Sequence, residues 1–272
     1  MFTRITESDS HYRHIEQMSV QAILENINRE DQKVAIAVET CLPEIGAFVK
    51  AAAQKMKFGG RLFYIGAGTS GRLGVLDASE CPPTYGVSPD LVIGLIAGGD
   101  HALRHPVEDA EDNKNQGWKD LLNHQISDAD VVVGIAASGT TPYVIETLRS
   151  CQTAQILTAC ITCNPEAPLT QVADYPMVAN VGPEFVTGST RMKSGTAQKL
   201  ILNMISTALM IQLGKVEDNK MVHMQLKNEK LRDRGILMLM QKTGLTDYEK
   251  AKALLKKYGS VFNAIENIST EF

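Results

Sequence analysis

The sequence predicts an α/β protein built on a doubly wound parallel sheet, with helical segments before and after the sheet. Five short apolar runs are separated by stretches of helical spacing, and such alternation is typical of this class. The runs are nearly continuous in apolar residues, as in strands that are covered by helices on both faces. With 272 residues, the chain is long enough to bury a sizeable core.

A helical segment precedes the predicted sheet. Residues 11–57 carry apolar side chains at loose helical spacing, with polar residues between them, and Gly59 and Gly60 end the region. Within this segment, Asp31 is a candidate cap for the start of a second helix.

The predicted strands follow in order, and a second helical region follows them. Five apolar runs predict strands at residues 61–65, 91–97, 130–136, 156–162 and 176–181. An apolar stripe predicts a long helix over 194–213, and the tail returns to helical spacing with a break near Gly259. In the tail, Thr246 and Glu249 have the spacing of a capping box. We therefore expect a helical N-terminal segment (1–50), a sheet domain (51–215) and a helical tail (216–272).

Composition and charge argue against several classes of function. The formal net charge is −4 and aromatic residues make up 6%, so we expect neither non-specific nucleic-acid binding nor a base-stacking surface. No apolar run approaches the roughly 18 residues that a membrane span needs. The N-terminus lacks the apolar region of a signal peptide. We expect no membrane partner and a cytoplasmic protein.

The five cysteines form no recognisable framework. Their number is odd, and Cys160 and Cys163 form a C-x-x-C with no second pair to complete a zinc site. Both lie in or beside an apolar run that predicts a buried strand. We expect inert core thiols and a reducing compartment.

Three loops at the predicted carboxyl ends of strands are rich in glycine and hydroxyl side chains. They cover residues 66–71, 137–141 and 182–191, and ligands of parallel sheets bind at such strand ends. Glycine lets the backbone approach an anion, hydroxyl and amide groups donate to it, and a following helix N-terminus adds its dipole. The candidate substrate-binding residues are Gly68, Thr69, Ser70, Ser138, Gly139, Thr140, Thr141, Glu184, Ser189 and Lys193.

Two other interpretations of these loops, a dinucleotide site and helix capping, compete with an anion site. The first loop fits the spacing G-x-G-x-x-G, but a dinucleotide site also needs an acid about 20 residues further on to hold a ribose. The candidate at the next strand end, Asp100, comes more than 30 residues after Gly66. The hydroxyls of Ser70, Ser138 and Thr140 could instead cap helices. Three such loops at equivalent positions favour a compact phosphate monoester.

The loops resemble those of the sugar isomerase (SIS) superfamily, which binds phosphosugars. Residues 60–86 and 182–207 are closely similar to the N-acetylmuramic acid 6-phosphate etherase family, and the likeness covers nearly the whole chain. The resemblance implies an SIS-type sheet and a ubiquitin-associated-like tail. It also implies a lyase of cell-wall recycling that produces N-acetylglucosamine 6-phosphate and D-lactate, with no metal and no cofactor.

The resemblance assigns two catalytic carboxyl groups. Glu80 matches the position of the family's proton donor, and Glu111 matches its second catalytic glutamate. Taken alone, the sequence places Glu80 among small and apolar residues before Pro82, so we expect partial burial and a helix that stops after it. Nothing in the residues selects Glu111 from the acidic run 108–112, which has the pattern of a solvated helix face.

Two other functions are compatible with phosphosugar-binding loops, and the apolar surface of the helices predicts the oligomeric state. An aldose–ketose phosphosugar isomerase would also need a base at C2. A non-catalytic phosphosugar sensor would resemble the vertebrate glucokinase regulator, which is a much larger chain with two SIS domains. The N-terminal helices and residues 194–213 carry more apolar surface than one sheet face needs. We therefore expect a homodimer with its active site near the subunit boundary.

Overall fold

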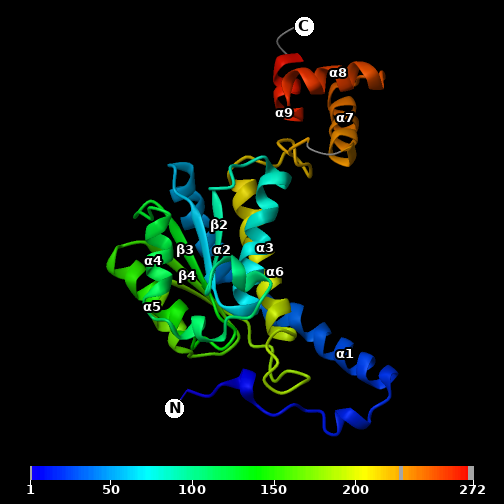
Figure 1. The fold of residues 1–272 in the computed structure, drawn as a ribbon. Helices are drawn as coiled ribbons and strands as arrows, with labels where there is room; N and C mark the ends of the chain where they lie inside the picture. Colours follow the sequence, from blue (N-terminus) through cyan, green and yellow to red (C-terminus); the bar gives the residue numbers. More distant parts are fainter. Residues whose placement is uncertain (1, 227–228, 269–272) are drawn as a thin grey trace.

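The computed structural model describes residues 2–226 and 229–268 and confirms the predicted parallel α/β sheet (Figure 1). Its five strands are β1 (Leu62–Gly66), β2 (Val92–Ile96), β3 (Val131–Ile135), β4 (Leu157–Thr162) and β5 (Tyr175–Val178). All neighbouring strands pair in parallel, in the order β2-β1-β3-β4-β5. Each lies within a few residues of the run that predicted it, because a doubly covered strand must be apolar at nearly every position.

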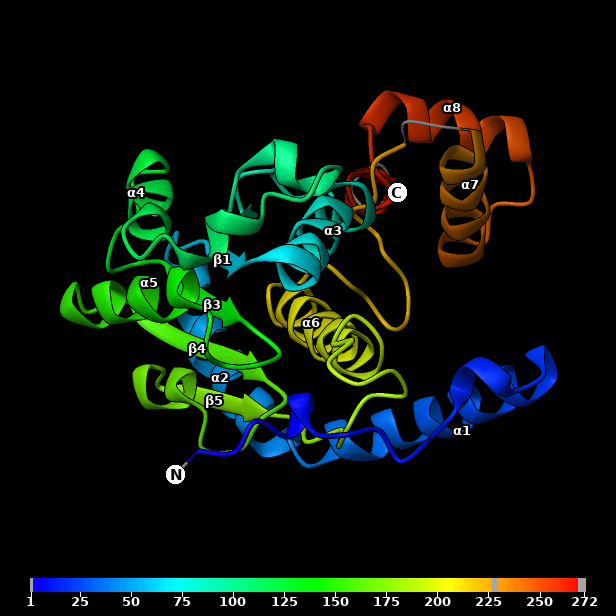
Figure 2. The same cartoon turned by 60° about the horizontal axis from the view of Figure 1, so that its bottom comes forward.

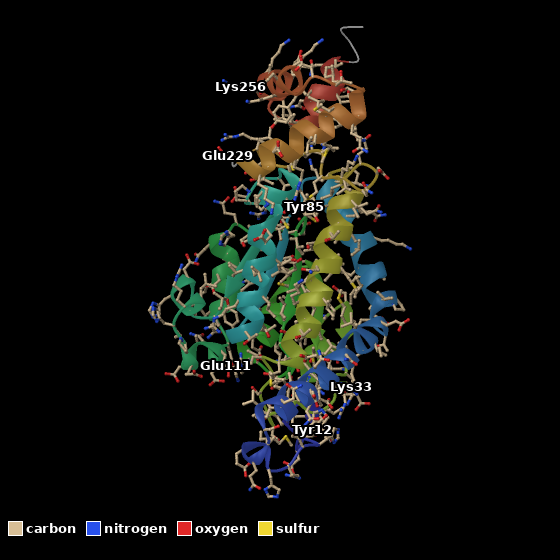
Figure 3. The ribbon with its side chains drawn as sticks, turned by 90° about the vertical axis from the view of Figure 1, so that its right-hand side faces the viewer. Tyr12, Lys33, Tyr85, Glu111, Glu229 and Lys256 are labelled. Atoms are coloured by element: carbon tan, nitrogen blue, oxygen red, sulfur yellow. The ribbon has the colours of Figure 1, made fainter. Side chains whose placement is uncertain are left out.

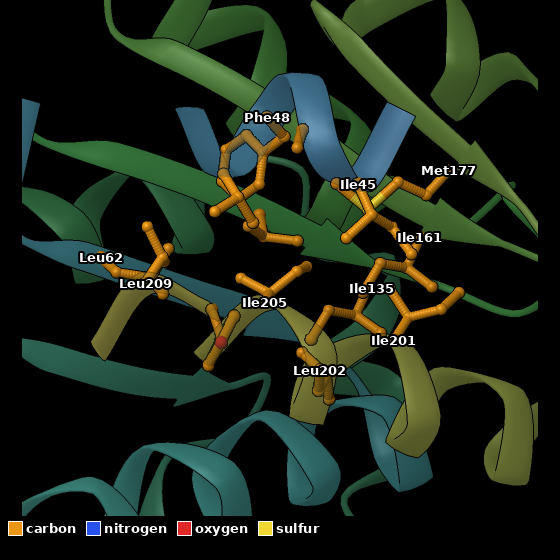
Figure 4. Packing of buried hydrophobic residues seen from close by; sticks show 14 of the residues in the cluster. Ile45, Phe48, Leu62, Ile135, Ile161, Met177, Ile201, Leu202, Ile205 and Leu209 are labelled. Carbon is orange, nitrogen blue, oxygen red and sulfur yellow. The ribbon is translucent and has the colours of Figure 1, made fainter. Parts of the chain in front are cut away.

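Helices cover both faces of the sheet (Figure 2). The α-helices are α1 (Val20–Glu39), α2 (Leu42–Lys57), α3 (Gly68–Tyr85), α4 (Gln116–Asn123), α5 (Pro142–Thr153), α6 (Lys193–Gln212), α7 (Glu229–Thr243), α8 (Tyr248–Tyr258) and α9 (Val261–Ile268). One core packs α2, α3 and α6 against the sheet, and a second core packs α4 and α5 against the other face. Figure 4 shows the first core, where Ile201, Ile205 and Leu209 of α6 meet the strands.

Successive strand residues divide between the two cores, as the alternation of side chains along a strand requires. Leu62 and Tyr64 of β1 face α2, α3 and α6, whereas Phe63 and Ile65 face α4 and α5. The cysteines join the same packing: all five are free and buried, as predicted. No helix within residues 2–226 and 229–268 is long and apolar enough to cross a membrane.

Three local predictions are wrong. Asp31 lies inside α1, and the break between the first two helices comes at residues 40–41. Pro82 lies inside α3, which continues to Tyr85 and ends at Gly86 with φ of 66°. The cap of α8 is Asp247 and not Thr246, because the Asp247 carboxylate accepts the hydrogen bond from the Lys250 N–H at 3.1 Å. The predicted break at Gly259 is confirmed.

Candidate active site

The strand order places two of the three predicted loops together. β1 and β3 are neighbours at the centre of the sheet, and the chain leaves them toward opposite edges. Such a switch point opens a crevice at the carboxyl ends of the two strands, where ligands bind in this class of sheet. The loops at these ends are residues 66–71 and 137–141.

The first loop packs so tightly that two glycines are required. A Cβ added to Gly66 would lie 2.8 Å from the Gly71 backbone nitrogen, and a Cβ on Gly71 would lie 2.7 Å from the Gly66 carbonyl oxygen. Gly68 begins α3 with φ of 52°, a conformation that side chains rarely adopt. The close turn brings the N-terminus of α3 directly to the end of β1, where its dipole favours an anion.

The Ser70 hydroxyl in this loop points toward α6. Ser70 is buried, and its Oγ donates to Gln198 Oε1 at 3.0 Å. Thr69 is more accessible than Ser70 and lines a cavity that also contains Glu111 and is described below. The structure thus places Gly68 and Thr69 at the crevice, and gives Ser70 a partner within the protein.

The second loop leaves a hydroxyl proton for a ligand. Ser138 Oγ accepts the backbone N–H of Thr140 at 3.2 Å and lies 3.1 Å from the Thr140 hydroxyl, so the two hydroxyls share one hydrogen bond and one of their two protons has no acceptor among the described residues. Gly139 has φ of 67°, and a Cβ there would lie 2.4 Å from that of Ala167. Thr141 is the N-cap residue of α5, without a side-chain capping bond. These residues form a compact group of donors at a helix N-terminus.

An N-terminal arm, residues 2–18, holds this loop from outside. Asn164 is fully buried, and its Nδ2 donates to the Ala137 and Ser138 carbonyl oxygens at 3.2 and 3.0 Å. Asn164 Oδ1 also accepts the backbone N–H of Thr6 at 3.1 Å, and Asn164 Nδ2 donates to the Thr6 hydroxyl at 2.9 Å. Sequence reasoning missed Asn164, because a buried asparagine after a strand has no distinctive local pattern.

The charged side chains of the third loop and of the start of α6 form hydrogen bonds with other groups of the protein. The Glu184 carboxylate accepts the backbone N–H groups of Lys193 and Ser194 at 2.9 Å each, and thereby caps α6. Lys193 Nζ donates to Glu30 Oε2 at 2.7 Å, and both side chains are buried. Ser189 is half-buried. Glu184 and Lys193 are therefore positioned to hold the loop, and Ser189 remains accessible.

Glu111 lies in a cavity beside the first loop. The cavity measures about 220 Å³ and is lined by Ala67, Gly68, Thr69, Arg72, Ala97, Ala102, Pro106, Val107, Glu108 and Glu111. Glu111 belongs to the short helix η4 (Glu108–Asp112). Partial burial raises its pKa, and the negative charges of Asp112 and Glu108 raise it further. A raised pKa brings a carboxyl group closer to the range that suits a general base near neutral pH.

Glu80 lies away from this cavity. It is exposed, so the expected partial burial is wrong for the single chain. It comes twelve residues after Gly68 on α3, a separation of about 18 Å along the helix axis. Glu80 lines a second cavity of about 200 Å³ with Leu73, Leu76, Asp77, Lys199, Leu202 and Asn203. Figure 3 shows Glu111 near one end of α3 and Tyr85 at the other.

A wider hollow of about 550 Å³ lies on the tail, along α7. It is lined by residues such as Lys230, Asp233 and Leu237 and contains none of the predicted site residues. The strand-end cavity with Glu111 is therefore the better candidate active site, although it is smaller.

Two family models match the chain. The glucokinase regulatory protein N-terminal SIS domain matches residues 44–152, and the SIS domain matches residues 113–208. Together they cover the sheet and most of the helices around it, in agreement with the SIS-type fold.

Curated relatives match over almost the entire chain. A Bacteroides fragilis protein named N-acetylmuramic acid 6-phosphate etherase is 60% identical over 97% of this chain and 94% of its own. A Porphyromonas gingivalis protein of the same name is 60% identical over 98% of this chain and 97% of its own.

Solved structures support the fold. A putative phosphosugar isomerase from Bacteroides fragilis has a TM-score of 0.53 and 20% identity, over 71% of this chain and 92% of its own. A phosphoheptose isomerase from Neisseria gonorrhoeae has a TM-score of 0.51 and 16% identity, over 70% of this chain and 96% of its own. At such identities the likeness concerns the fold alone.

Proposed function

Because the chain belongs to the N-acetylmuramic acid 6-phosphate etherase family, we propose that it cleaves the D-lactyl ether of N-acetylmuramic acid 6-phosphate. The products are N-acetylglucosamine 6-phosphate and D-lactate, as expected for a carbon–oxygen lyase of cell-wall recycling. The observation that carries the proposal is the 60% identity over 97% of the chain. Its five free, buried thiols suit the reducing cytoplasm in which we place this enzyme.

The reaction is an elimination followed by an addition of water. In the open-chain sugar, the C2 proton is acidic because C2 adjoins the aldehyde. The Glu111 carboxylate takes this proton, the electron pair forms a C2=C3 double bond, and the C3–O bond breaks. Glu80, as a carboxylic acid, gives its proton to the departing lactate oxygen. Water then adds at C3 and C2 regains a proton, so that the net reaction consumes one water.

The phosphate is assigned to the donors at the strand ends. Ser138, Gly139, Thr140 and Thr141 surround the N-terminus of α5, and one of the two hydroxyl protons of Ser138 and Thr140 has no acceptor among the described residues. Backbone N–H groups and the helix dipole favour a dianion at this place. Gly68, Thr69 and Ser70 at the N-terminus of α3 complete the crevice, with Ser189 as a further hydroxyl donor. Glu184 and Lys193 act through the loop that they hold.

We assign Glu80 to the active site of a second copy of the chain. Within one chain, Glu80 and Glu111 line different cavities, whereas the reaction needs both carboxyl groups on adjacent carbons of one sugar. α1 and α3 both pack against α6, and these three helices expose large apolar side chains. They are Val20, Leu24, Ile36, Leu76, Met204 and Ile211, which are 37–74% exposed. A homodimer through this surface would bury them and bring Glu80 to the partner's cavity.

Mixed dimers test this assignment. Glu80→Gln and Glu111→Gln chains are each expected to be inactive alone, since an amide neither donates nor accepts the proton. After unfolding and refolding together in equal amounts, half of the dimers contain one chain of each kind. If the glutamates come from different chains, one site in each mixed dimer is intact, and about a quarter of wild-type activity returns. No recovery in mixtures that form mixed dimers would place both glutamates in one chain.

Release of D-lactate tests the proposed function itself. The purified chain is incubated with N-acetylmuramic acid 6-phosphate, and D-lactate is measured by its enzymatic oxidation. An etherase releases D-lactate and N-acetylglucosamine 6-phosphate in equal amounts. An isomerase would convert the sugar without lactate, and a sensor would bind without conversion. Either of these results would overturn the proposal.

A further inference from the structure

The cavity that contains Glu111 carries more negative than positive side chains, although the substrate of the proposed function is itself an anion. Among the residues that line the cavity, Glu108 and Glu111 are acidic and Arg72 is the single basic one. N-acetylmuramic acid 6-phosphate brings two anions, the phosphate on C6 and the lactyl carboxylate on C3. An anion beside two carboxylates in a partly desolvated cavity is unfavourable unless a cation faces it.

Arg72 is held in place by its own hydrogen bonds. On the first turns of α3, its Nε donates to the Leu103 carbonyl oxygen at 3.0 Å and its Nη2 donates to the Ala102 carbonyl oxygen at 2.7 Å. Its Nη1 makes no hydrogen bond with any residue that the structure describes. A planar guanidinium anchored through two nitrogens is preorganised, so little side-chain entropy is lost when the third nitrogen binds an anion.

The chemistry of the sugar decides which of the two anions this nitrogen meets. Glu111 must reach the C2 proton, and the lactyl ether stands on the adjacent carbon C3. A sugar that places C2 at Glu111 therefore brings the lactyl group into the same cavity, next to Arg72. The phosphate is at the other end of the sugar and has its own donors at residues 138–141.

We propose that Arg72 binds the carboxylate of the lactyl group and thereby selects the muramic acid ether; this inference rests on the proposed function. Arginine matches a carboxylate in geometry and charge better than lysine does. The contact also orients the C3–O bond relative to the base.

The test compares ligands with and without the lactyl carboxylate. The 3-O-ethyl ether of N-acetylglucosamine 6-phosphate keeps the phosphate and the ether but lacks the carboxylate. It serves as a substrate that releases ethanol or, if it is not cleaved, as a competitive inhibitor. The proteins are the wild type, Arg72→Gln and Arg72→Lys, with Arg104→Gln as a matched control. Arg104 is an exposed arginine two residues beyond Ala102 and does not line the cavity.

We expect Arg72→Gln to lower kcat/KM for the lactyl substrate by roughly 10- to 100-fold, the effect of losing one hydrogen bond between charged groups. kcat/KM or the inhibition constant for the ethyl ether should change less than about threefold, as should the Kd for N-acetylglucosamine 6-phosphate. Arg72→Lys should fall between the two proteins, because it keeps the charge but not the two hydrogen bonds that anchor the guanidinium. Arg104→Gln should behave as the wild type.

Three results would overturn the proposal. Equal losses for both ethers would mean that Arg72 only holds residues 102–103. A matching loss of affinity for N-acetylglucosamine 6-phosphate would mean that Arg72 binds the phosphate. An unchanged lactyl kcat/KM in Arg72→Lys and Arg72→Gln would mean that it binds neither. Retained affinity for N-acetylglucosamine 6-phosphate also shows that a variant has folded. A wild type that releases no D-lactate would refute the proposed function instead, which is a separate outcome.

Discussion

Replacing Glu30 with glutamine should remove about 3 kcal/mol from the free energy of unfolding. Glu30 on α1 accepts a hydrogen bond of 2.7 Å from Lys193 Nζ, and the two side chains are only 4% and 2% exposed. A glutamine leaves the Lys193 ammonium buried without its counterion, and breaking such a buried pair costs roughly 3–5 kcal/mol. Because Lys193 begins α6, the loss also loosens the loop that precedes this helix.

The lowered pKa of Glu30 implies a similar magnitude. Burial raises the pKa of Glu30, but hydrogen bonds from Lys193 and Lys33 outweigh burial and lower the pKa from 4.5 to about 2. A carboxyl pKa lowered to this extent stabilises the fold by ~3 kcal/mol at neutral pH. Since the folded-state pKa is the lower one, this stability is complete above the unfolded pKa of 4.5 and is lost as the pH falls toward 2.

Urea unfolding at pH 7 and pH 3, followed by circular dichroism, measures the effect. Glu146→Gln is the matched control, because the Arg149–Glu146 pair has side chains 55% and 30% exposed and should contribute at most ~1 kcal/mol. We expect the loss in Glu30→Gln to be ~3 kcal/mol at pH 7 and clearly smaller at pH 3. A loss at pH 7 no larger than that of the control would refute this reasoning.

Three further predictions concern single positions. Ser70→Ala should change the Kd of N-acetylglucosamine 6-phosphate less than about threefold, because the Ser70 hydroxyl already donates its proton to Gln198; a loss of roughly 10- to 100-fold in calorimetry would mean that this hydroxyl turns to the phosphate in the complex. Gly139→Ala should lower the urea midpoint more than Gly99→Ala does: both glycines have positive φ, but only at Gly139 would the new Cβ meet a neighbouring Cβ at 2.4 Å. Burial raises the pKa of Asp77 to about 6, so its contribution to stability falls as the pH rises from about 4 to 6. Asp77→Asn should therefore be more stable than the wild type at pH 8 and not at pH 4; the same difference at both values would contradict the pKa shift.

The sheet and the strand-end loops could be predicted from local patterns. β1 and β3 are buried at every position, so their sequences are continuous apolar runs. The backbone of the first loop approaches itself so closely that only glycine fits at Gly66 and Gly71, and these glycines are visible in the sequence as a short motif. Both signals are contained in a few consecutive residues.

The functions of charged side chains could not be predicted in this way. Glu184 was a candidate for substrate binding, but its carboxylate caps α6, a helix that begins nine residues later. Lys193 pairs with Glu30, a residue more than 160 positions away, and no local pattern reveals such a partner. Glu80 was expected to be partly buried, but it is exposed on α3, about 18 Å along the helix axis from Gly68.

The most direct test of the two-carboxylate mechanism is proton NMR of N-acetylmuramic acid 6-phosphate in D₂O with the Glu80→Gln and Glu111→Gln proteins. Glu111→Gln should lose the exchange of the C2 proton for deuterium, because its amide cannot accept that proton. Glu80→Gln should keep the exchange but slow D-lactate release by roughly 10²–10⁴-fold, since proton removal precedes departure of the lactate. The opposite pattern would reverse the two roles. Turnover near the wild-type rate in both variants would contradict the mechanism.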